Sequence, residues 1–348
     1  MITEGAFAMA EEELSIREML EAREHQIFSP YAAFADQSKG RERDEEQCDM
    51  RTCFQRDRDR IIHSKSFRRL KGKTQVFLAP EGDHYRTRLT HTLEVSQISR
   101  SIARALFLNE DLTEAIALGH DLGHTPFGHC GERVLNQLCS EGFNHAAQSV
   151  RVVQKLDNQG NGLNLTYEVI DGIVNHQTVG RAKTLEGRIV RVSDKIAYVN
   201  HDVDDAIRGL ILKEEDIPER FRSTLGRSFK ERIDRMIHDV IHQSAGKDDI
   251  YMSSEIEEAM KDLRQYMFDH IYTNPVAKGE EGKAAKIVEY LFHEYMDHPD
   301  MMSRRYQKMT DDGEPLERVV CDYVSGMTDN FAIMKFRQLT IPDSWDIY

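Results

Sequence analysis

The chain has 348 residues, of which 40% are hydrophobic, and a formal net charge of −14. This length allows one large domain or two of ordinary size. The negative charge provides no general attraction to nucleic acid or anionic membranes, so a phosphate ligand would need local positive charge. No apolar run is long enough to predict a transmembrane helix, and the acidic N-terminus lacks the basic start of a signal peptide. We therefore expect a cytoplasmic protein whose five scattered cysteines are reduced thiols.

The composition, with eight prolines among many Glu, Lys, Arg, Leu and Ala residues, predicts an all-α protein. An amphipathic helix is expected over 9–25 and a polar, mobile loop over 29–50. Residues 54–77 predict a helix with one apolar and one basic side. The basic side is either a solvated face with Asp–Arg pairs or a phosphate-binding surface. The turn signals in residues 74–88 predict a short hairpin or loop.

Apolar residues at helical spacing predict the remaining helices. We expect Thr90 to cap a helix that buries Leu93, Ile98, Ile102 and Leu106. The other helices are expected over 109–122, 128–138, 146–156, 169–174, 186–210, 218–244, 253–272, 282–296 and 314–338. The predicted parts are an N-terminal helix and loop (1–53), a catalytic core (54–210) and a C-terminal helical extension packed on that core (211–348).

The stretch Ala115–Glu132, AIALGHDLGHTPFGHCGE, concentrates groups that can perform chemistry. Its three histidines and two carboxylates are His120, Asp121, His124, His129 and Glu132. An adjacent His–Asp pair can supply two metal ligands from one helix end. The further His and Glu could then act as acid and base beside the metal. Gly119 and Gly123 bracket the pair, and we expect them to allow close approach of backbone and ligand.

A metal site here needs ligands from elsewhere in the chain. His91, at the start of one predicted helix, and Asp194, on another, are the natural candidates. Together with His120 and Asp121 they would leave positions open on a six-coordinate metal for water and substrate. Asp194, Tyr198 and Asp202 lie four residues apart and therefore share one helix face.

This order of ligands resembles the HD-domain metal phosphohydrolase superfamily. Several motifs are similar to the deoxyguanosine triphosphate triphosphohydrolase family: Arg88 three residues before His91, GHDLGHTPFGHCGE, SDKIAYVNHD, DYVSGMTD and RDRDRIIHSKSFRRLKGKTQVF. The resemblance covers about residues 54–336. It implies an all-helical HD-domain fold with additional C-terminal helices. It also implies hydrolysis of a deoxynucleoside triphosphate, with dGTP preferred, at the α-phosphorus, which yields the deoxynucleoside and inorganic triphosphate.

The resemblance also implies roles for individual residues. One divalent metal, with Mn²⁺ or Mg²⁺ favoured over Fe²⁺, Ni²⁺, Co²⁺ or Zn²⁺, would be bound by His91, His120, Asp121 and Asp194. Proton transfer would belong to His129 and Glu132. The implied phosphate contacts are Arg88, His124, His145 and Lys195. Tyr198 and Asp202 would line the sugar pocket and exclude a 2′-hydroxyl by a steric clash, and Gln75 would read the base or the 3′-hydroxyl.

The sequence leaves open the oligomeric state, the effector and two alternative functions. Family members are often homo-oligomers, and many respond to a dNTP or single-stranded DNA effector. The apolar faces at 314–338 suit either self-association or intramolecular packing. The alternative enzyme is an HD phosphodiesterase or nucleotidase acting on monophosphates or cyclic dinucleotides, in which His124, His145 or His176 would bind a second ion. We otherwise expect His176 to be structural. A third interpretation is a nucleotide-sensing regulator with a vestigial site.

Overall fold

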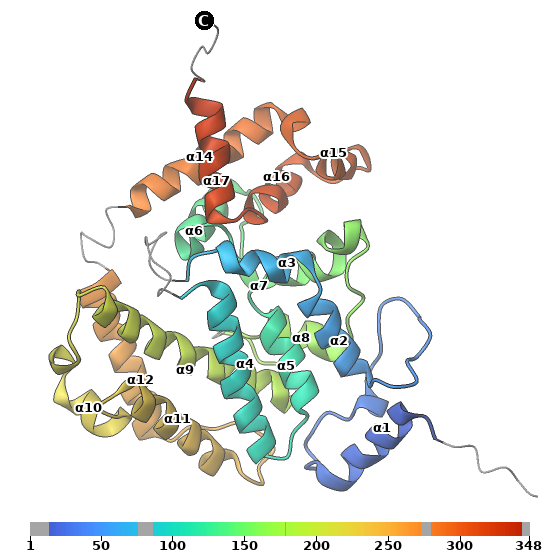
Figure 1. Ribbon diagram of the computed structural model, residues 1–348, viewed down its shortest axis with the longest axis vertical. Helices are drawn as coiled ribbons and strands as arrows, with labels where there is room; N and C mark the ends of the chain where they lie inside the picture. The colour runs from blue at the N-terminus through green and yellow to red at the C-terminus, as the bar shows by residue number, and fades with distance from the viewer. Residues whose placement is uncertain (1–13, 76–85, 178, 273–279, 343–348) are drawn as a thin grey trace, which may run out of the picture.

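The computed structural model describes residues 14–75, 86–177, 179–272 and 280–342. Within these ranges the chain is all-α, as predicted, and contains no β-strand (Figure 1). Two isolated bridges occur, Arg41–Thr166 and Thr74–Thr87. The second bridge joins the ends of the predicted hairpin, whose residues 76–85 lie outside the described residues. None of the described helices is long and apolar enough to cross a membrane.

The N-terminal part begins with helix α1 (Ile16–Ile27), which ends two residues later than predicted. Residues 9–13 of the predicted helix lie outside the described residues. The side chain of Ser15 accepts a hydrogen bond from the backbone of Glu18, and Glu18 bonds back to Ser15, so this capping box sets the start. The following loop contains one short 3-10 turn, Ala35–Gln37. Its mobility stays a prediction.

The basic segment forms two helices, α2 (Cys53–Ile62) and α3 (Lys65–Arg69), rather than the single predicted helix. The chain turns at Ser64, whose side chain caps α3. The arginines of α2 are occupied by ion pairs, with Arg58 2.9 Å from Asp111 and Arg60 2.7 Å from Glu45. The interpretation as a charged face with ion pairs therefore describes α2.

Four helices form the centre of the molecule: α4 (Arg88–Ala105), α5 (Glu110–Gly119), α8 (Tyr167–Val174) and α9 (Leu185–Arg208) (Figure 1). Two shorter helices, α6 (Gly128–Leu138) and α7 (His145–Arg151), follow α5. Thr87, not Thr90, caps α4, because Thr87 closes the bridge to Thr74 and Thr90 bonds back to it. The prediction that Leu93 is buried is wrong, since half of it is exposed.

The C-terminal half is more divided than predicted. Its helices are α10 (Glu219–Leu225), α11 (Phe229–Ser244), α12 (Ser254–Met267), α14 (Glu281–Asp297), α15 (Arg304–Asp311), α16 (Leu316–Ser325) and α17 (Asp329–Thr340). Gly226 separates α10 from α11 at a φ of +126°, where a Cβ would lie 2.8 Å from the backbone nitrogen of Arg232. Thr328 caps α17 and so separates it from α16. Helix α15 was not predicted.

The buried apolar residues form two clusters. The larger one joins the central helices to α10–α12, and the smaller one joins α6 to α14, α16 and α17. Val319, Val320 and Val324 of α16 are fully buried, so intramolecular packing accounts for the apolar face of this helix. The self-association and the domain boundaries at 53 and 210 stay predictions.

One pair of cysteines contradicts the expectation of five free thiols. Cys139, at the end of α6, forms a disulfide with Cys321 of α16, 182 residues away in the sequence. Cys48, Cys53 and Cys130 are free. The spacing of cysteines could not reveal this bond, because only the packing of α6 against α16 brings the two sulfurs together.

A buried acidic pair attaches the N-terminal loop to the core. Glu186 accepts hydrogen bonds of 3.0 Å from the backbone N–H groups of Ala33 and Asn109. Glu24 accepts from the backbone of Ala35 at 2.7 Å and from the side chain of Asn109 at 3.2 Å. Burial raises the pKa of both carboxyl groups to about 7. A raised pKa favours the protonated acid in the folded chain.

This raised pKa predicts that the protein loses stability as the pH rises from about 4.5 through about 7. The contribution of Glu186 is complete below its unfolded pKa of 4.5 and is lost as the pH rises through about 7. Glu186→Gln keeps an acceptor oxygen but does not titrate. We therefore expect its free energy of unfolding, relative to that of the native chain, to rise by roughly 2–3 kcal/mol when the pH is raised from about 5 to about 8. Urea unfolding at both pH values measures this difference. The exposed Glu289→Gln is the control, and a pH-independent difference for Glu186→Gln would contradict the prediction.

Candidate active site

The His–Asp pair lies in a rigid turn at the end of α5. The ring Nδ1 of His120 donates to the carbonyl of Ala117 at 2.7 Å, which leaves Nε2 as the free lone pair. The hydroxyl of Ser149 donates to the carbonyl of His120 and accepts from the N–H of Gly123, each at 2.8 Å. The direction of the His120 ring is therefore determined on both sides of the turn.

The two glycines around the pair allow helices, not a ligand, to approach. A Cβ on Gly123 would lie 2.2 Å from the backbone nitrogen of Ser149, and one on Gly119 would lie 2.6 Å from Ile173. The predicted close approach of backbone is confirmed at Gly123, where α7 lies against the turn, and Gly119 makes room for α8. The predicted approach of a ligand stays a prediction.

The four predicted metal ligands come together from three helices. Nε2 of His91 on α4 lies 3.1 Å from Oδ1 of Asp194 on α9 and 4.0 Å from Asp121. Nε2 of His120 lies 3.4 Å from Asp121 and 3.9 Å from Asp194. This Nε2 is buried and has no hydrogen-bond partner among the described residues. An unpartnered buried imidazole nitrogen beside two carboxylates fits a divalent metal ion. The group of His91, His120 and Asp121 could hold one, and Asp194 lies beside this group, 3.1 Å from His91.

The charge state of the carboxylates also suits a metal. Burial raises the pKa of Asp121, but His120, His124 and Arg88 hold it well below its usual range. Burial raises the pKa of Asp194, but the hydrogen bond from His91 and the proximity of His120 lower this pKa to about 2. Both groups are therefore carboxylates at neutral pH, the form that binds metal.

The ring of His91 is held from behind by a residue that we did not predict. Nδ1 of His201 lies 3.3 Å from Nδ1 of His91, and Nε2 of His201 lies 3.1 Å from Glu94. Burial lowers the pKa of His201 to about 2, so the ring is neutral. The spacing does contain a signal, because His201 follows Asp194 by seven residues and so shares its face of α9.

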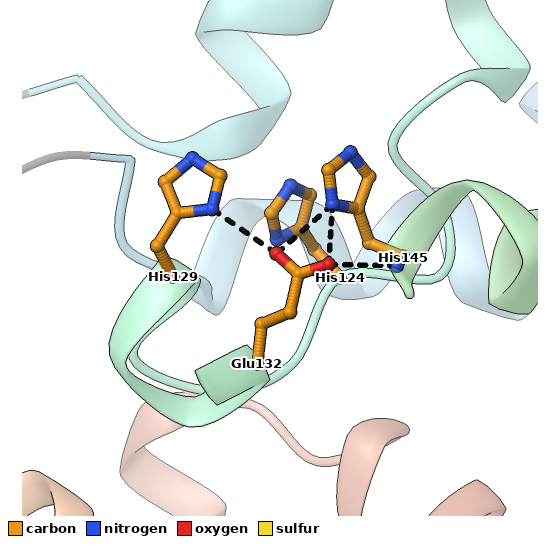
Figure 2. A group of neighbouring side chains, drawn as sticks. All are labelled: His124, His129, Glu132 and His145. Carbon is orange, nitrogen blue, oxygen red and sulfur yellow. Dashed lines mark hydrogen bonds and ion pairs between the residues drawn. The ribbon is translucent and has the colours of Figure 1, made fainter. Parts of the chain in front are cut away.

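Glu132 joins two histidines rather than one (Figure 2). Its carboxylate lies 3.1 Å from Nδ1 of His129 and 2.8 Å from Nδ1 of His145, and it accepts the backbone N–H of His145 at 2.9 Å. The ring of His124 stacks on that of His145 with centroids 3.9 Å apart. Burial raises the pKa of Glu132, but its bonds to both histidines hold it well below its usual range. His129 is 69% exposed, whereas His145 is buried.

Arg88 carries a buried positive charge with unused donors. Its Nη1 donates to Asp121 at 2.8 Å, while Nε and Nη2 have no partner among the described residues. Unpaired guanidinium N–H groups beside a metal cluster suit a phosphate. The predicted assignment of Arg88 to phosphate is compatible with this geometry.

Of the residues predicted to contact the sugar or base, Tyr198 and Asp202 lie on α9, and Gln75 lies next to Gly128. Burial raises the pKa of Tyr198 to about 12 and raises that of Asp202 well above its usual range. Oδ1 of Asp202 and Oε1 of Gln75 are buried without a partner among the described residues. Burial lowers the pKa of the partly exposed Lys195. These unused polar atoms are available to a ligand.

His176 lies in contact with His145, one of the predicted phosphate contacts. Its Nδ1 donates to the carbonyl of Ile173 at 2.7 Å, and its Nε2 lies 3.3 Å from Nε2 of His145. Potential ligand atoms of Asp121, His145 and His176 lie within 4.8 Å of one another. The expectation that His176 is structural stays a prediction.

Comparison with known proteins places the chain. Residues 88–199 match the HD domain model, and residues 250–338 match the phosphohydrolase-associated domain model. A deoxyguanosinetriphosphate triphosphohydrolase-like protein of Caldanaerobacter subterraneus subsp. tengcongensis is 57% identical over 332 residues, which cover 95% of this chain and 98% of the relative. The chain belongs to the deoxyguanosinetriphosphate triphosphohydrolase-like family. A family member of Desulfatibacillum aliphaticivorans is 47% identical over 94% of this chain and 99% of its own length.

The resemblance to the family stated from the motifs is thus confirmed, and the HD phosphohydrolase domain makes the chain a hydrolase. A solved structure of a Bacteroides thetaiotaomicron phosphohydrolase matches with a TM-score of 0.53 at 15% identity, over 81% of this chain and 69% of that chain. At this identity the likeness concerns the fold alone.

One further residue of this family member reaches the site from outside the HD domain match. The guanidinium of Arg264 on α12 lies over the ring of Tyr198, 5.5 Å from its centroid. Its charge also acts on Lys195 and Asp202. The sequence holds no local signal for this position, because α12 reaches α9 only through tertiary packing.

The orientation of the imidazoles predicts how metal affinity responds to substitution. We expect His120→Ala to abolish binding of Mn²⁺, because it removes the free Nε2. His201→Ala should weaken Mn²⁺ binding about 10–100-fold through its contact with His91. Titration with Mn²⁺ followed by elemental analysis measures both effects. The exposed His63→Ala is the control, and full Mn²⁺ content in His120→Ala would contradict the assignment.

Proposed function

We propose that the protein is a metal-dependent dNTP triphosphohydrolase that converts a deoxynucleoside triphosphate, with dGTP preferred, to the deoxynucleoside and inorganic triphosphate. The single observation that carries this proposal is the arrangement around Asp121. The free Nε2 of His120 lies on one side of it and the unpaired N–H groups of Arg88 on the other. The relatives are named deoxyguanosinetriphosphate triphosphohydrolase-like proteins, which supports dGTP as the substrate.

A divalent ion, Mn²⁺ or Mg²⁺, would be held by His91, His120, Asp121 and Asp194. When bound, it supplies Lewis-acid polarisation of a phosphoryl oxygen. Arg88 binds phosphate oxygens through Nε and Nη2 while its Nη1 stays on Asp121. His124, which stacks on His145, and Lys195 add donors to the triphosphate. The positive charges of Arg88 and Lys195 neutralise charge that develops on the phosphorus.

Departure of the 5′-oxygen requires a proton. His129 donates it, and Glu132 orients the ring through Nδ1 and stabilises the imidazolium form. The same carboxylate holds His145 against His124, so one anion places both histidines. The ring of Tyr198 bounds the deoxyribose, Asp202 binds its hydroxyl group, and Gln75 reads the base or the 3′-hydroxyl.

We further propose that the enzyme acts in the cytoplasm, where it controls the dNTP pool, and that it forms a homo-oligomer. An anionic effector, a dNTP or single-stranded DNA, has a basic cavity available away from the metal cluster. This cavity of about 990 Å³ is lined by Arg43, Lys65, Arg68, Arg305 and Lys308, and also by Asp44, Asp157 and the Arg60–Glu45 ion pair. Nε and Nη2 of Arg305 are buried without a partner among the described residues.

The reaction predicts its products. With dGTP and Mn²⁺ we expect deoxyguanosine and tripolyphosphate, because the leaving group is the 5′-oxygen. Chromatography of the nucleoside and phosphate products, over all four dNTPs and with a second dNTP as activator, tests both the reaction and its preference. Release of dGMP and pyrophosphate would overturn the reaction assignment.

A second candidate is an HD phosphodiesterase or nucleotidase with two ions. The group of Asp121, His145 and His176 favours it, because it offers a second set of ligands next to the first. Two tightly bound ions per chain, together with turnover of a cyclic dinucleotide or a monophosphate but not of dGTP, would select this candidate.

The assignment of Glu132 to proton transfer predicts that its substitution lowers the rate of the reaction without changing metal binding. We expect Glu132→Gln to lower kcat about 10²–10⁴-fold, because the neutral amide no longer stabilises a protonated His129. Bound Mn²⁺ should stay unchanged, because Glu132 is not among the proposed ligands. Steady-state kinetics and elemental analysis measure the two effects. The exposed Glu141→Gln is the control, and an unchanged kcat in Glu132→Gln would refute its role.

A further inference from the structure

The turn between the metal cluster and α6 is bound by the C-terminal helices. This turn, residues 124–128, connects His124 to the helix that carries His129 and Glu132. It includes two consecutive left-handed residues, Phe127 at φ +61° and Gly128 at φ +56°. A left-handed conformation is unfavourable for Phe, so surrounding contacts must hold it.

Asp329, the first residue of α17, supplies one such contact. It is buried, with 4% of its surface exposed. Its Oδ1 accepts the backbone N–H of Phe127 at 2.9 Å, and its Oδ2 accepts the backbone N–H of Thr74 at 3.0 Å and the Thr74 hydroxyl. One carboxylate therefore ties the left-handed residue to the segment that precedes Gln75.

Lys73 supplies a second contact from the same side. Its ammonium group is buried and donates to the carbonyl of His124 and, at 2.8 Å, to the carbonyl of Ser325 at the end of α16. The carbonyl of Lys73 in turn accepts the backbone N–H of Arg88 at 3.1 Å. Ser325 and Asp329 both lie in the DYVSGMTD motif, to which the proposed chemistry assigns no task.

We propose that Asp329 and Lys73 are positioning residues through which the phosphohydrolase-associated region sets the place of His129 and Glu132 relative to the metal cluster. The metal cluster belongs to α4, α5 and α9, whereas α6 packs with α14, α16 and α17. The turn is a covalent link between the two groups, and two of its backbone groups, the N–H of Phe127 and the carbonyl of His124, bond to Asp329 and Lys73. This inference rests on the proposed function only for its effect on catalysis.

The test uses Asp329→Asn in the full chain, because the amide keeps the size of the side chain. The N–H groups of Phe127 and Thr74 bind different oxygens of Asp329, and in Asn one of these positions is an NH₂ donor that cannot accept a hydrogen bond. We expect kcat for dGTP to fall about 10–100-fold, as for a displacement of the acid–base pair by about 1 Å, with KM changed far less and bound Mn²⁺ unchanged. The exposed Asp312→Asn is the matched control and should behave as the native chain.

Hydrogen–deuterium exchange provides a readout independent of activity. Exchange in a peptide covering 124–132 should rise in Asp329→Asn, while exchange in α4 and α9 stays unchanged. A native kcat together with native exchange in this peptide would overturn the proposal, and so would a uniform rise over the whole chain with kcat per folded molecule unchanged. If the native chain does not hydrolyse dNTPs, the proposed reaction fails, whereas the exchange measurement still decides the role of Asp329.

Discussion

The buried carboxylate of Asp121 is the group on which the arrangement of the site depends. It lies 2.8 Å from Arg88, 3.4 Å from His120 and 3.5 Å from His124, in an interior where an unpaired charge is costly. Its partners come from α4 and from both sides of the turn after α5. The two helices must therefore pack in one register, which their fully buried residues Ile102 and Ile116 help to determine. The atoms left over are those that a metal and a phosphate would use.

The second constraint is the division of the proposed chemistry between two hydrophobic clusters. The metal cluster lies on helices of the larger one, and the acid–base pair lies on α6, which belongs to the smaller one. Apolar packing within each cluster cannot place one relative to the other. We propose that the polar contacts across the 124–128 turn contribute to this placement, because hydrogen bonds are directional. This gives the C-terminal helices a physical connection to chemistry performed by residues far away in the sequence.

Local patterns predicted the elements where local interactions set them. The bounds of α6 agree with the prediction, because its apolar residues have a clear helical period. The start of α4 was wrong by three residues, since the bridge between Thr74 and Thr87 overrides the capping preference of Thr90. The break at Gly226 was missed because a single glycine inside a helical pattern is often tolerated. In the site, His201 and Arg264 were missed although each adjoins a predicted residue.

By itself the sequence determined the helical class, the family and the candidate ligands His91, His120, Asp121 and Asp194. These depend on residue type and on spacing along one helix or turn, which the chain carries locally. Only the tertiary structure decided that Glu132 holds both His129 and His145, that Cys139 joins Cys321, and that Asp329 reaches Phe127. Thr74 and Asp329 are 255 residues apart. Contacts over such separations follow from how complete helices pack, and no local pattern records that packing.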